Sequence, residues 1–336
     1  MATIYEVSEL AGVSLATVSR VINGSGVVSE KTRRKVLVAM EELQYRPNSI
    51  AQSLASSRSN CVGVLVSELH GPFFGAMLSV IERELRKAGK FVLFTAGHSD
   101  ATREQEGIRF LVGRNCDALI IHAEAVSDRF LLDPENFPVP FVLINRSLAG
   151  LEGNCISLNN EYGSYMASRY LLQMGHREIA YISGPLDWTD ARERLAGHKR
   201  ALAEYGVAFD DKLLYEGDYH EVGGSNAVVR LLGKGVRFTA VACANDEMAV
   251  GAMAAVRDRG LKVPGDLSFI GFDNAPMSRY VHPKLSTIDY PVADMSRMAV
   301  NWVMKTVYGE KGVEVQEVFE PCLLVRESVE PVKRGV

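Results

Sequence analysis

The sequence predicts an α/β protein in which a small all-α headpiece precedes a two-lobed core of doubly wound parallel sheets. Apolar residues in the first 60 positions recur at helical spacing, with glycine and proline between the stretches. From Cys61 onward, short continuous apolar runs alternate with amphipathic helical stretches, which is typical of parallel strands covered on both faces. This alternation runs through two series, and two series predict two lobes.

Length and composition are those of a soluble protein of two or three domains, with 336 residues, 47% of them hydrophobic and 23% charged. No apolar run approaches the roughly 20 residues that span a bilayer, and the N-terminus MATIYEVSEL lacks a signal-peptide profile. We therefore expect a cytoplasmic protein. The five cysteines are scattered and never in CxxC spacing, so we predict no disulfide framework and no metal site.

Charge is distributed unevenly along the chain. Residues 1–60 hold seven lysines and arginines against five acids, whereas the remainder holds 30 basic residues against 36 acids. A basic segment joined to an acidic one is typical of a small nucleic-acid-binding module on a separate partner domain.

Three short helices are predicted in the headpiece. Ile4–Ala11 has apolar residues at helical spacing and is followed by Gly12, which suits a tight turn. Ser14 can cap a second helix, Leu15–Ile22, and Ser29 a third. The predicted inward faces of these two helices consist of Val18, Val21, Ile22, Val36, Ala39, Met40 and Leu43. Periodicity alone also permits a three-helix bundle without a partner.

The motif AGVSLATVSRVIN, followed by VSEKTRRKV and YRPNSIAQSLA, resembles the lac/galactose repressor family without a gap over residues 1–58. The resemblance implies a helix-turn-helix whose second helix enters the major groove of operator DNA. Arg20 would then donate to guanine O6 and N7, while Leu15 and Ala16 would meet a thymine methyl group. The DNA-contacting residues implied on this helix are Leu15, Ala16, Thr17, Ser19, Arg20 and Asn23.

A hinge is expected after the third helix, which Pro47 ends. Asn48, which is also among the residues expected to contact DNA, can cap a helix over 49–55 that is too short to be stable alone in water. By the resemblance this segment folds on DNA, and Leu54 matches a leucine inserted into the minor groove; packing within a linker is the alternative for Leu54. Residues 56–60 are predicted to be a flexible polar joint. The predicted domains are therefore a headpiece over 1–46, a hinge and linker over 47–60, and an effector-binding and dimerisation domain over 61–336.

The core is predicted as strands and helices in alternation. The predicted strands are Val62–Val66, Phe91–Thr95, Ala118–Ile121, Phe141–Ile144, Ile156–Leu158, Ile179–Ser183, Ala240–Cys243 and Leu267–Gly271. The predicted helices are Phe74–Ala88, Thr102–Arg114, Tyr162–Met174, Asp190–Tyr205 and Asp246–Arg259. No GxGxxG follows a strand, and neither GxxxxGK[ST] nor HExxH occurs, so we predict no enzyme, no catalytic residues, no cofactor and no metal.

The resemblance continues over essentially the whole chain. PFFGAML, VLINRS, MGHREIAYISGP, AVACANDEMAVGAM and VPGDLSFIGFDNAP are similar to the periplasmic-binding-protein-like core of the same family. GRNCDALIIHAEAVSD and SRYVHPKLSTIDYP are closest to its galactose repressor and isorepressor branch. The resemblance implies three crossings between the lobes, with 61–158 and the helix near 292–308 in the first lobe.

Candidate pocket residues lie at or just after strand ends, or early in a helix. By family position, Arg194 and Asp273 would be polar clamps for sugar hydroxyls, with Asn245 as the amide. Asp246 is predicted to be a helix N-cap rather than a ligand group. The other implied effector-binding residues are Phe73, Phe74 and Tyr219 as aromatic walls, and His122 and Asn145 on the first lobe.

The implied function is a repressor of carbohydrate-utilisation genes that binds a palindromic operator as a homodimer, under allosteric control by a small sugar such as galactose. Three departures from the galactose pattern leave another hexose or a disaccharide open. Tyr219 follows Gly217-Asp218, Gly71 stands in place of an acid, and Asn159-Asn160 replaces paired acids. A purine- or nucleoside-responsive regulator is the alternative within the family, and a sugar-binding transport protein is the alternative outside it.

Overall fold

The computed structural model describes residues 2–23, 26–45 and 58–332. The chain divides into two compact units, one of Met1–Cys61 with Asn115–Asp117 and one of Val62–Arg114 with Ala118–Val336. The predicted boundary between headpiece and hinge, at residue 46, lies outside the described residues. No helix among the described residues is long and apolar enough to cross a membrane.

The headpiece contains three helices: α1 (Ile4–Ala11), α2 (Leu15–Asn23) and α3 (Glu30–Glu42). Thr3 and Glu6 form a capping box at the start of α1, and Gly12 ends that helix in the left-handed conformation at φ 64°. The predicted caps are present, since Ser14 Oγ accepts from the Thr17 amide at 3.2 Å and Ser29 caps α3. The helices enclose a small core of Val7, Ala11, Val18, Val21, Val36 and Ala39.

The segment that enters the core is held by one carboxylate. Asp117 Oδ1 accepts hydrogen bonds from the Ser59 amide at 2.8 Å and from Ser59 Oγ at 3.0 Å. Asp117 Oδ2 accepts from the Asn60 amide at 2.9 Å. The prediction of a flexible joint over 56–60 is therefore wrong for Ser59 and Asn60, because backbone amides paired with a carboxylate are fixed in place.

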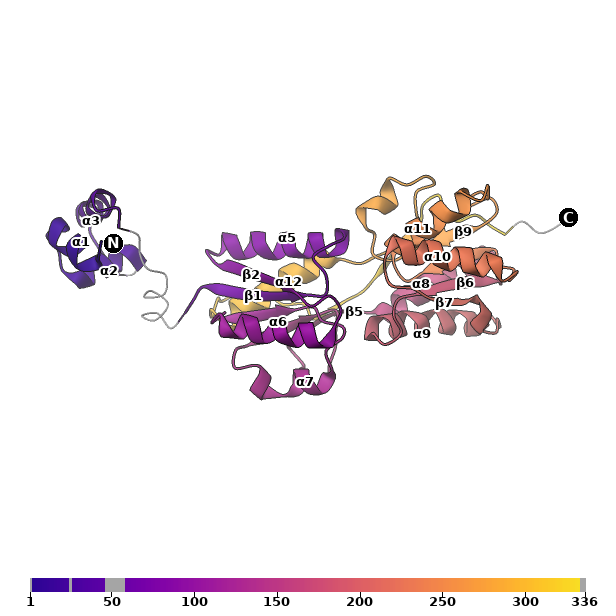
Figure 1. Cartoon of the computed structure of the whole chain (residues 1–336), viewed down its shortest axis with the longest axis horizontal. Coiled ribbons are helices and arrows are strands. Elements are labelled where there is room, and N and C mark those ends of the chain that lie inside the picture. The colour runs from indigo at the N-terminus through magenta and orange to yellow at the C-terminus, as the bar shows by residue number, and fades with distance from the viewer. Residues whose placement is uncertain (1, 24–25, 46–57, 333–336) are drawn as a thin grey trace. The chain divides into compact units, whose positions relative to one another are not determined.

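The first lobe is built on a sheet with the strand order β11-β5-β4-β3-β1-β2 (Figure 1). Its strands are β1 (Cys61–Val66), β2 (Phe91–Ala96), β3 (Ala118–Ile121), β4 (Phe141–Ile144), β5 (Cys155–Leu158) and β11 (Val318–Phe319). Its helices are α5 (Pro72–Lys87), α6 (Ala101–Gly113), α7 (Asp128–Leu132) and α12 (Val292–Thr306). In Figure 1, α5 and α6 lie on opposite faces of this sheet. Because helices cover both faces, the central strands are continuously apolar.

The second lobe is built on a parallel sheet with the strand order β7-β6-β8-β9. Its strands are β6 (Ile179–Ser183), β7 (Leu214–Glu216), β8 (Ala240–Cys243) and β9 (Ser268–Ile270), with an antiparallel pair of β10 (Thr287–Asp289) and β12 (Cys322–Leu324). Its helices are α8 (Asn160–Gln173), α9 (Thr189–Glu204), α10 (Glu221–Gly233) and α11 (Asp246–Arg257). Glycines allow these helices to pack closely, since a Cβ at Gly224 would lie 2.0 Å from the Met248 carbonyl oxygen.

The chain crosses between the lobes three times, after β5, after β10 and after β11. Helix α12 packs on α5 and on strands β3, β4 and β5, in agreement with the first-lobe assignment of the helix near 292–308. The α/β prediction with parallel sheets is confirmed. Helices α7 and α10 and the short strands β7, β10, β11 and β12 were not predicted from the sequence. The strands have only two or three residues each, too few to show a periodicity.

Candidate functional site

One pocket lies between the two lobes, and its walls include the residues that follow the carboxyl ends of several strands. Ser67, His122 and Asn145 come directly after β1, β3 and β4, and Asn245 follows β8 by two residues. Ligands of doubly wound sheets bind in this position. All eight predicted effector-binding residues line this pocket, namely Phe73, Phe74, His122, Asn145, Arg194, Tyr219, Asn245 and Asp273.

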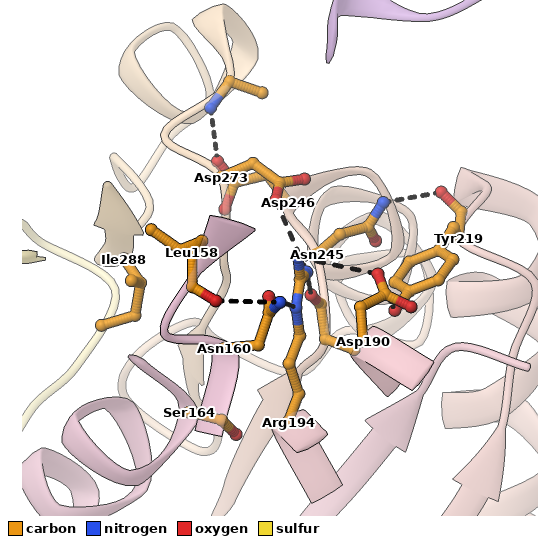
Figure 2. Close-up of polar contacts among 12 residues, drawn as sticks. Leu158, Asn160, Ser164, Asp190, Arg194, Tyr219, Asn245, Asp246, Asp273 and Ile288 are labelled. Carbon is orange, nitrogen blue, oxygen red and sulfur yellow. Dashed lines mark hydrogen bonds and ion pairs between the residues drawn. The ribbon is translucent and has the colours of Figure 1, made fainter. Parts of the chain in front are cut away.

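Among the described residues that line the pocket, Arg194 on α9 is the only lysine or arginine. Its guanidinium donates to Asn160 Oδ1 at 2.9 Å and to the Ala244 carbonyl oxygen at 2.5 Å (Figure 2). It lies 3.5 Å from Asp273 Oδ1 and 3.8 Å from Asp190 Oδ2, and its side chain is only 3% exposed. Its planar group also lies over the Phe272 ring at 3.8 Å. The guanidinium is therefore fixed in one orientation, as a clamp for hydroxyl groups requires.

Two carboxyl groups flank this guanidinium. Asp190 Oδ2 accepts a hydrogen bond from the Tyr219 hydroxyl at 3.0 Å. Burial raises the pKa of Asp273 to about 7, although the nearby Arg194 guanidinium opposes this shift. Asp273 therefore exchanges its proton near neutral pH and can either donate to a ligand hydroxyl or accept from one.

A chain of hydrogen bonds runs from Arg194 into the first lobe. Asn160, the first residue of α8, accepts from Arg194 and donates through Nδ2 to Asn145 Oδ1 at 3.3 Å. Asn145 in turn donates through Nδ2 to Glu124 Oε1 at 3.3 Å. Because α8 directly follows the first crossing, these hydrogen bonds link the pocket to the connection between the lobes.

Glu124 lines the pocket with a buried carboxyl group that is not fully hydrogen-bonded among the described residues. Its side chain is buried, and among the described residues Oε2 has no hydrogen-bond partner. Burial raises the pKa of Glu124 well above its usual value and so favours the neutral carboxyl group. His122 is neutral there, because burial lowers its pKa to about 4. Both groups therefore offer uncharged hydrogen-bonding atoms, which suits a neutral polyol.

Aromatic rings form two parts of the wall. Phe73 and Phe74 meet edge to face with centroids 5.2 Å apart, and Phe74 lies 5.2 Å from the His122 ring. On the second lobe, Trp188 stacks on Tyr219 with centroids 5.6 Å apart. Flat apolar faces of this kind pack against the C–H surface of a sugar ring or against a planar base.

Three pocket residues have left-handed backbones that favour glycine. The φ angles are 65° at Asn145, 66° at Tyr219 and 109° at Asp273. Non-glycine residues keep such angles only where the surrounding structure fixes them, and they gather at functional sites. A Cβ at Gly184 would lie 2.2 Å from Tyr219 Cζ, so the tyrosine ring occupies the space that glycine leaves.

The cap of α11 differs from the prediction. Asn245, not Asp246, is the N-cap, and its Oδ1 accepts from the Met248 amide at 3.0 Å while its Nδ2 donates to the Tyr219 carbonyl oxygen at 2.7 Å. Asp246 is buried and accepts from Thr287 Oγ1 at 2.6 Å and from the Ala275 amide at 2.8 Å. Asp246 therefore joins α11 to the segments around the second crossing.

Sequence reasoning did not select Glu124, Asp190 or Trp188, which also line the pocket. Glu124 follows β3 by three residues, and Asp190 lies four residues before Arg194 on α9. The strand-end rule could have selected Glu124, and the i,i+4 spacing from Arg194 could have selected Asp190. The indole of Trp188, directly before α9, gave no periodic signal that would separate it from core packing.

In the headpiece, the predicted DNA-contacting residues from Leu15 to Asn23 all lie on α2. Ala16 and Arg20 are exposed, whereas Leu15, Thr17 and Ser19 are half-buried. The Thr17 hydroxyl lies 2.9 Å from Ser14 Oγ, so one of its hydrogen bonds serves the helix cap. The predicted contacts Asn48 and Leu54 lie outside the described residues.

Comparison with known proteins agrees with both parts. Residues 3–48 match the family of bacterial regulatory proteins named lacI, and residues 168–329 match the periplasmic binding protein-like domain. The chain is 43% identical over 329 residues to the regulator GalR of Escherichia coli K12, covering 98% of this chain and 96% of that protein. It is 39% identical over 329 residues to GalS of Salmonella typhimurium LT2, covering 98% and 97%.

Among solved structures, the lac repressor dimer bound to operator and the anti-inducer ONPF aligns with a TM-score of 0.87 at 30% identity. The alignment covers 98% of this chain and 99% of that one. The predicted resemblance is therefore confirmed over nearly the full length. This protein belongs to the lacI family of bacterial regulatory proteins, and its relatives are transcriptional regulators.

Proposed function

We propose that this protein is a repressor of carbohydrate-utilisation genes that binds a palindromic operator as a homodimer and is released from it by an unphosphorylated sugar. The observation that carries the proposal is the pocket, in which one fixed guanidinium, neutral hydrogen-bonding groups and aromatic faces converge. The helix-turn-helix supports the operator as the nucleic-acid partner, because α2 exposes Arg20 and Ala16. A two-fold dimer would match the symmetry of such an operator.

The charge of the pocket favours a neutral sugar over a sugar phosphate. Its carboxyl groups are those of Glu68, Glu124, Asp190, Asp218, Glu247 and Asp273, and Arg194 is already paired with two of them. A phosphate group is usually held by several free cationic donors, and the carboxyl groups nearby would repel it. An uncharged hydroxyl group can pair with a carboxyl group in either protonation state.

The size of the pocket favours a single sugar ring. Its internal volume is about 90 Å³. So small a space favours one sugar ring, whereas a disaccharide needs the lobes to open further. Galactose is therefore our first candidate, and the GalR and GalS relatives support it.

The alternative effector is a purine or nucleoside. The stacked rings of Trp188 and Tyr219 favour it, because planar bases pack on such faces. A sugar-binding transport protein would not need a DNA-binding headpiece, which argues against that alternative. We also expect no enzymatic turnover of the bound sugar.

Release from DNA would begin at the chain of hydrogen bonds between the lobes. A sugar bound to Arg194 and Glu124 contacts both ends of that chain, so it would favour one relative position of the lobes over another. Coupling of this kind is typically worth about 1–3 kcal/mol. The lobe movement would then bias the hinge segment between a DNA-bound and a free form.

The test is operator binding by the purified full-length protein at fixed salt, with DNA from upstream of its own gene neighbourhood. Hexoses, disaccharides, hexose phosphates, purines and nucleosides are titrated in turn. We expect an unphosphorylated hexose to weaken binding and its phosphate to have no effect. Action by a purine alone, or tighter binding with the sugar, would contradict the proposed effector and leave the DNA-binding role in place.

A further inference from the structure

A cluster of potential metal ligands includes residues of the pocket lining, and none of its members is among the eight predicted effector-binding residues. His220, Glu221 and Glu247 each place one potential ligand atom within 4.8 Å of the other two. His220 and Glu247 line the pocket, as does His70 from the other lobe. We propose that these four residues form a zinc site that bridges the two lobes.

The two histidines approach each other from different lobes. His70 follows β1 of the first lobe, whereas His220 is the N-cap of α10 in the second. Their ring centroids are 6.3 Å apart. Imidazoles that share one zinc ion have centroids roughly 5–6 Å apart, given zinc–nitrogen distances of about 2 Å. A small rotation of either exposed ring therefore brings both nitrogens to one ion.

Glu247 lies beside His220 and close to the backbone of the first lobe. Its Oε1 would be 3.1 Å from a Cβ built on Gly71, the neighbour of His70. Any side chain at Gly71 would therefore press on this carboxylate. Glu247 is half-buried, and in the part of the chain that the structure describes its carboxylate makes no hydrogen bond or ion pair with protein groups. A half-buried carboxylate beside two imidazoles is what a cation would neutralise.

The ligand chemistry favours zinc over calcium or magnesium. Two imidazole nitrogens with carboxylate oxygens suit Zn²⁺, which is bound with four ligands, whereas calcium and magnesium prefer oxygen ligands alone. In a four-coordinate site the ligand atoms are roughly 3.4 Å apart. The ligand atoms of His220, Glu221 and Glu247 lie within 4.8 Å of one another, a spread that rotation of surface side chains can reduce.

A bridging ion would act on the protein through the lobes. His70 belongs to the first lobe, and the other three residues belong to the second, so only a closed arrangement supplies all four ligands. Zinc would therefore stabilise that arrangement and, by linkage, bind more tightly to it than to an open one. The inference goes beyond the proposed effector, because metal binding is measured on the protein without sugar.

The test is titration of the metal-free full-length protein with Co²⁺, which reports its coordination in the visible spectrum, followed by displacement with Zn²⁺. We expect one ion per chain with the intense absorption of a four-coordinate site. His70→Asn and His220→Asn should each lower the affinity tenfold or more. His282→Asn, which changes an exposed histidine outside the cluster, is the matched control and should leave affinity unchanged.

Three outcomes would overturn the proposal. The first is the absence of saturable binding to the wild-type protein. The second is a loss of affinity in His220→Asn but not in His70→Asn, because the ion would then not bridge the lobes. The third is a thiolate-to-cobalt absorption band, which would place the ion on cysteines elsewhere. Far-UV circular dichroism of the metal-free variants checks that each change at these exposed histidines leaves the fold intact.

Discussion

Arg194 and Asn160 are joined by a hydrogen bond of 2.9 Å from guanidinium Nε to amide Oδ1. Asn160 begins α8, where the chain first enters the second lobe, and it also donates to Asn145 of the first lobe. One side chain therefore contacts both Arg194 in the pocket and the connection between the lobes. A ligand that draws Arg194 toward itself would alter the hydrogen bond between Arg194 and Asn160. Through Asn160 it would also alter the contact with Asn145 of the first lobe.

Replacing Arg194 should separate effector sensing from DNA binding. Arg194→Ala should abolish the response of operator binding to the sugar and leave operator binding without sugar in place. Alanine also leaves Asp190 and Asp273 without their cation, and removing one partner from a buried ion pair costs about 3–5 kcal/mol of stability. Arg194→Lys is therefore the matched variant, since it keeps the charge but loses the planar fork.

For Arg194→Lys we expect sugar affinity to fall at least tenfold by calorimetry, with operator affinity without sugar unchanged in an anisotropy titration. A normal sugar response in either variant would remove Arg194 from the binding residues.

Glu124 should contribute as a neutral hydrogen-bonding group. Its pKa is raised well above the usual value by burial, and its Oε2 has no hydrogen-bond partner among the described residues. Glu124→Gln keeps a neutral group of the same shape, so sugar affinity should stay within a few-fold of the wild type. Glu124→Ala should weaken sugar binding by about 1–3 kcal/mol. Calorimetry on both variants decides this, and an equal loss in both would mean that the sugar requires the ionised carboxylate.

Asp273 should make the protein less stable as the pH rises toward neutrality. Burial raises its pKa to about 7, whereas an unfolded aspartate has a pKa of about 3.9. Between these values the folded state holds a proton that the unfolded chain has lost. The contribution of this group is therefore full below about pH 4 and declines, by at most about 1.4 kcal/mol per pH unit, until about pH 7.

The measurement is urea unfolding of the wild type and Asp273→Asn across this pH range, and the difference between their free energies of unfolding isolates the group. That difference should fall with rising pH and level off above about pH 7. A difference that rises or stays flat would contradict the raised pKa.

Much of this architecture could be predicted because it depends on local patterns. Strands such as Ala118–Ile121 and Phe141–Ile144 are apolar throughout, and the structure has them at the predicted residues. The strand-end rule also identified Asn245, since parallel strands bring their carboxyl ends to one edge; Asn145 came from the family resemblance instead. These features need no knowledge of how distant segments pack.

What could not be predicted depends on contacts between segments far apart in the sequence. Asp246 accepts from Thr287 and Ala275 rather than capping its own helix, and those partners lie in loops without periodicity. Asp117 binds Ser59, which lies 58 residues away in the sequence. The polar composition of the joint alone therefore could not show this contact. Glu124 was missed because a loop carboxyl group shows its burial only once the lobes are folded.

Leu54 should matter for operator binding alone. It lies outside the described residues, and the prediction that it enters the minor groove rests on the matching sequence of the hinge. Leu54→Ala should weaken operator binding markedly, because a wedge between base steps is lost, and should leave sugar affinity and the unfolding temperature unchanged. Unchanged operator affinity in an anisotropy titration would show that Leu54 is linker packing.

Arg20 should supply sequence specificity through a direct contact with a base. It is exposed on α2, and its side-chain stem passes beside Gly26, where a Cβ would lie 3.4 Å from Arg20 Cδ. Arg20→Ala should cost about 1–3 kcal/mol on the cognate operator and much less on random DNA. Equal losses on both DNAs, measured at one salt concentration, would instead assign Arg20 to a contact with the phosphate backbone. The loss of such a contact weakens binding to all sequences alike.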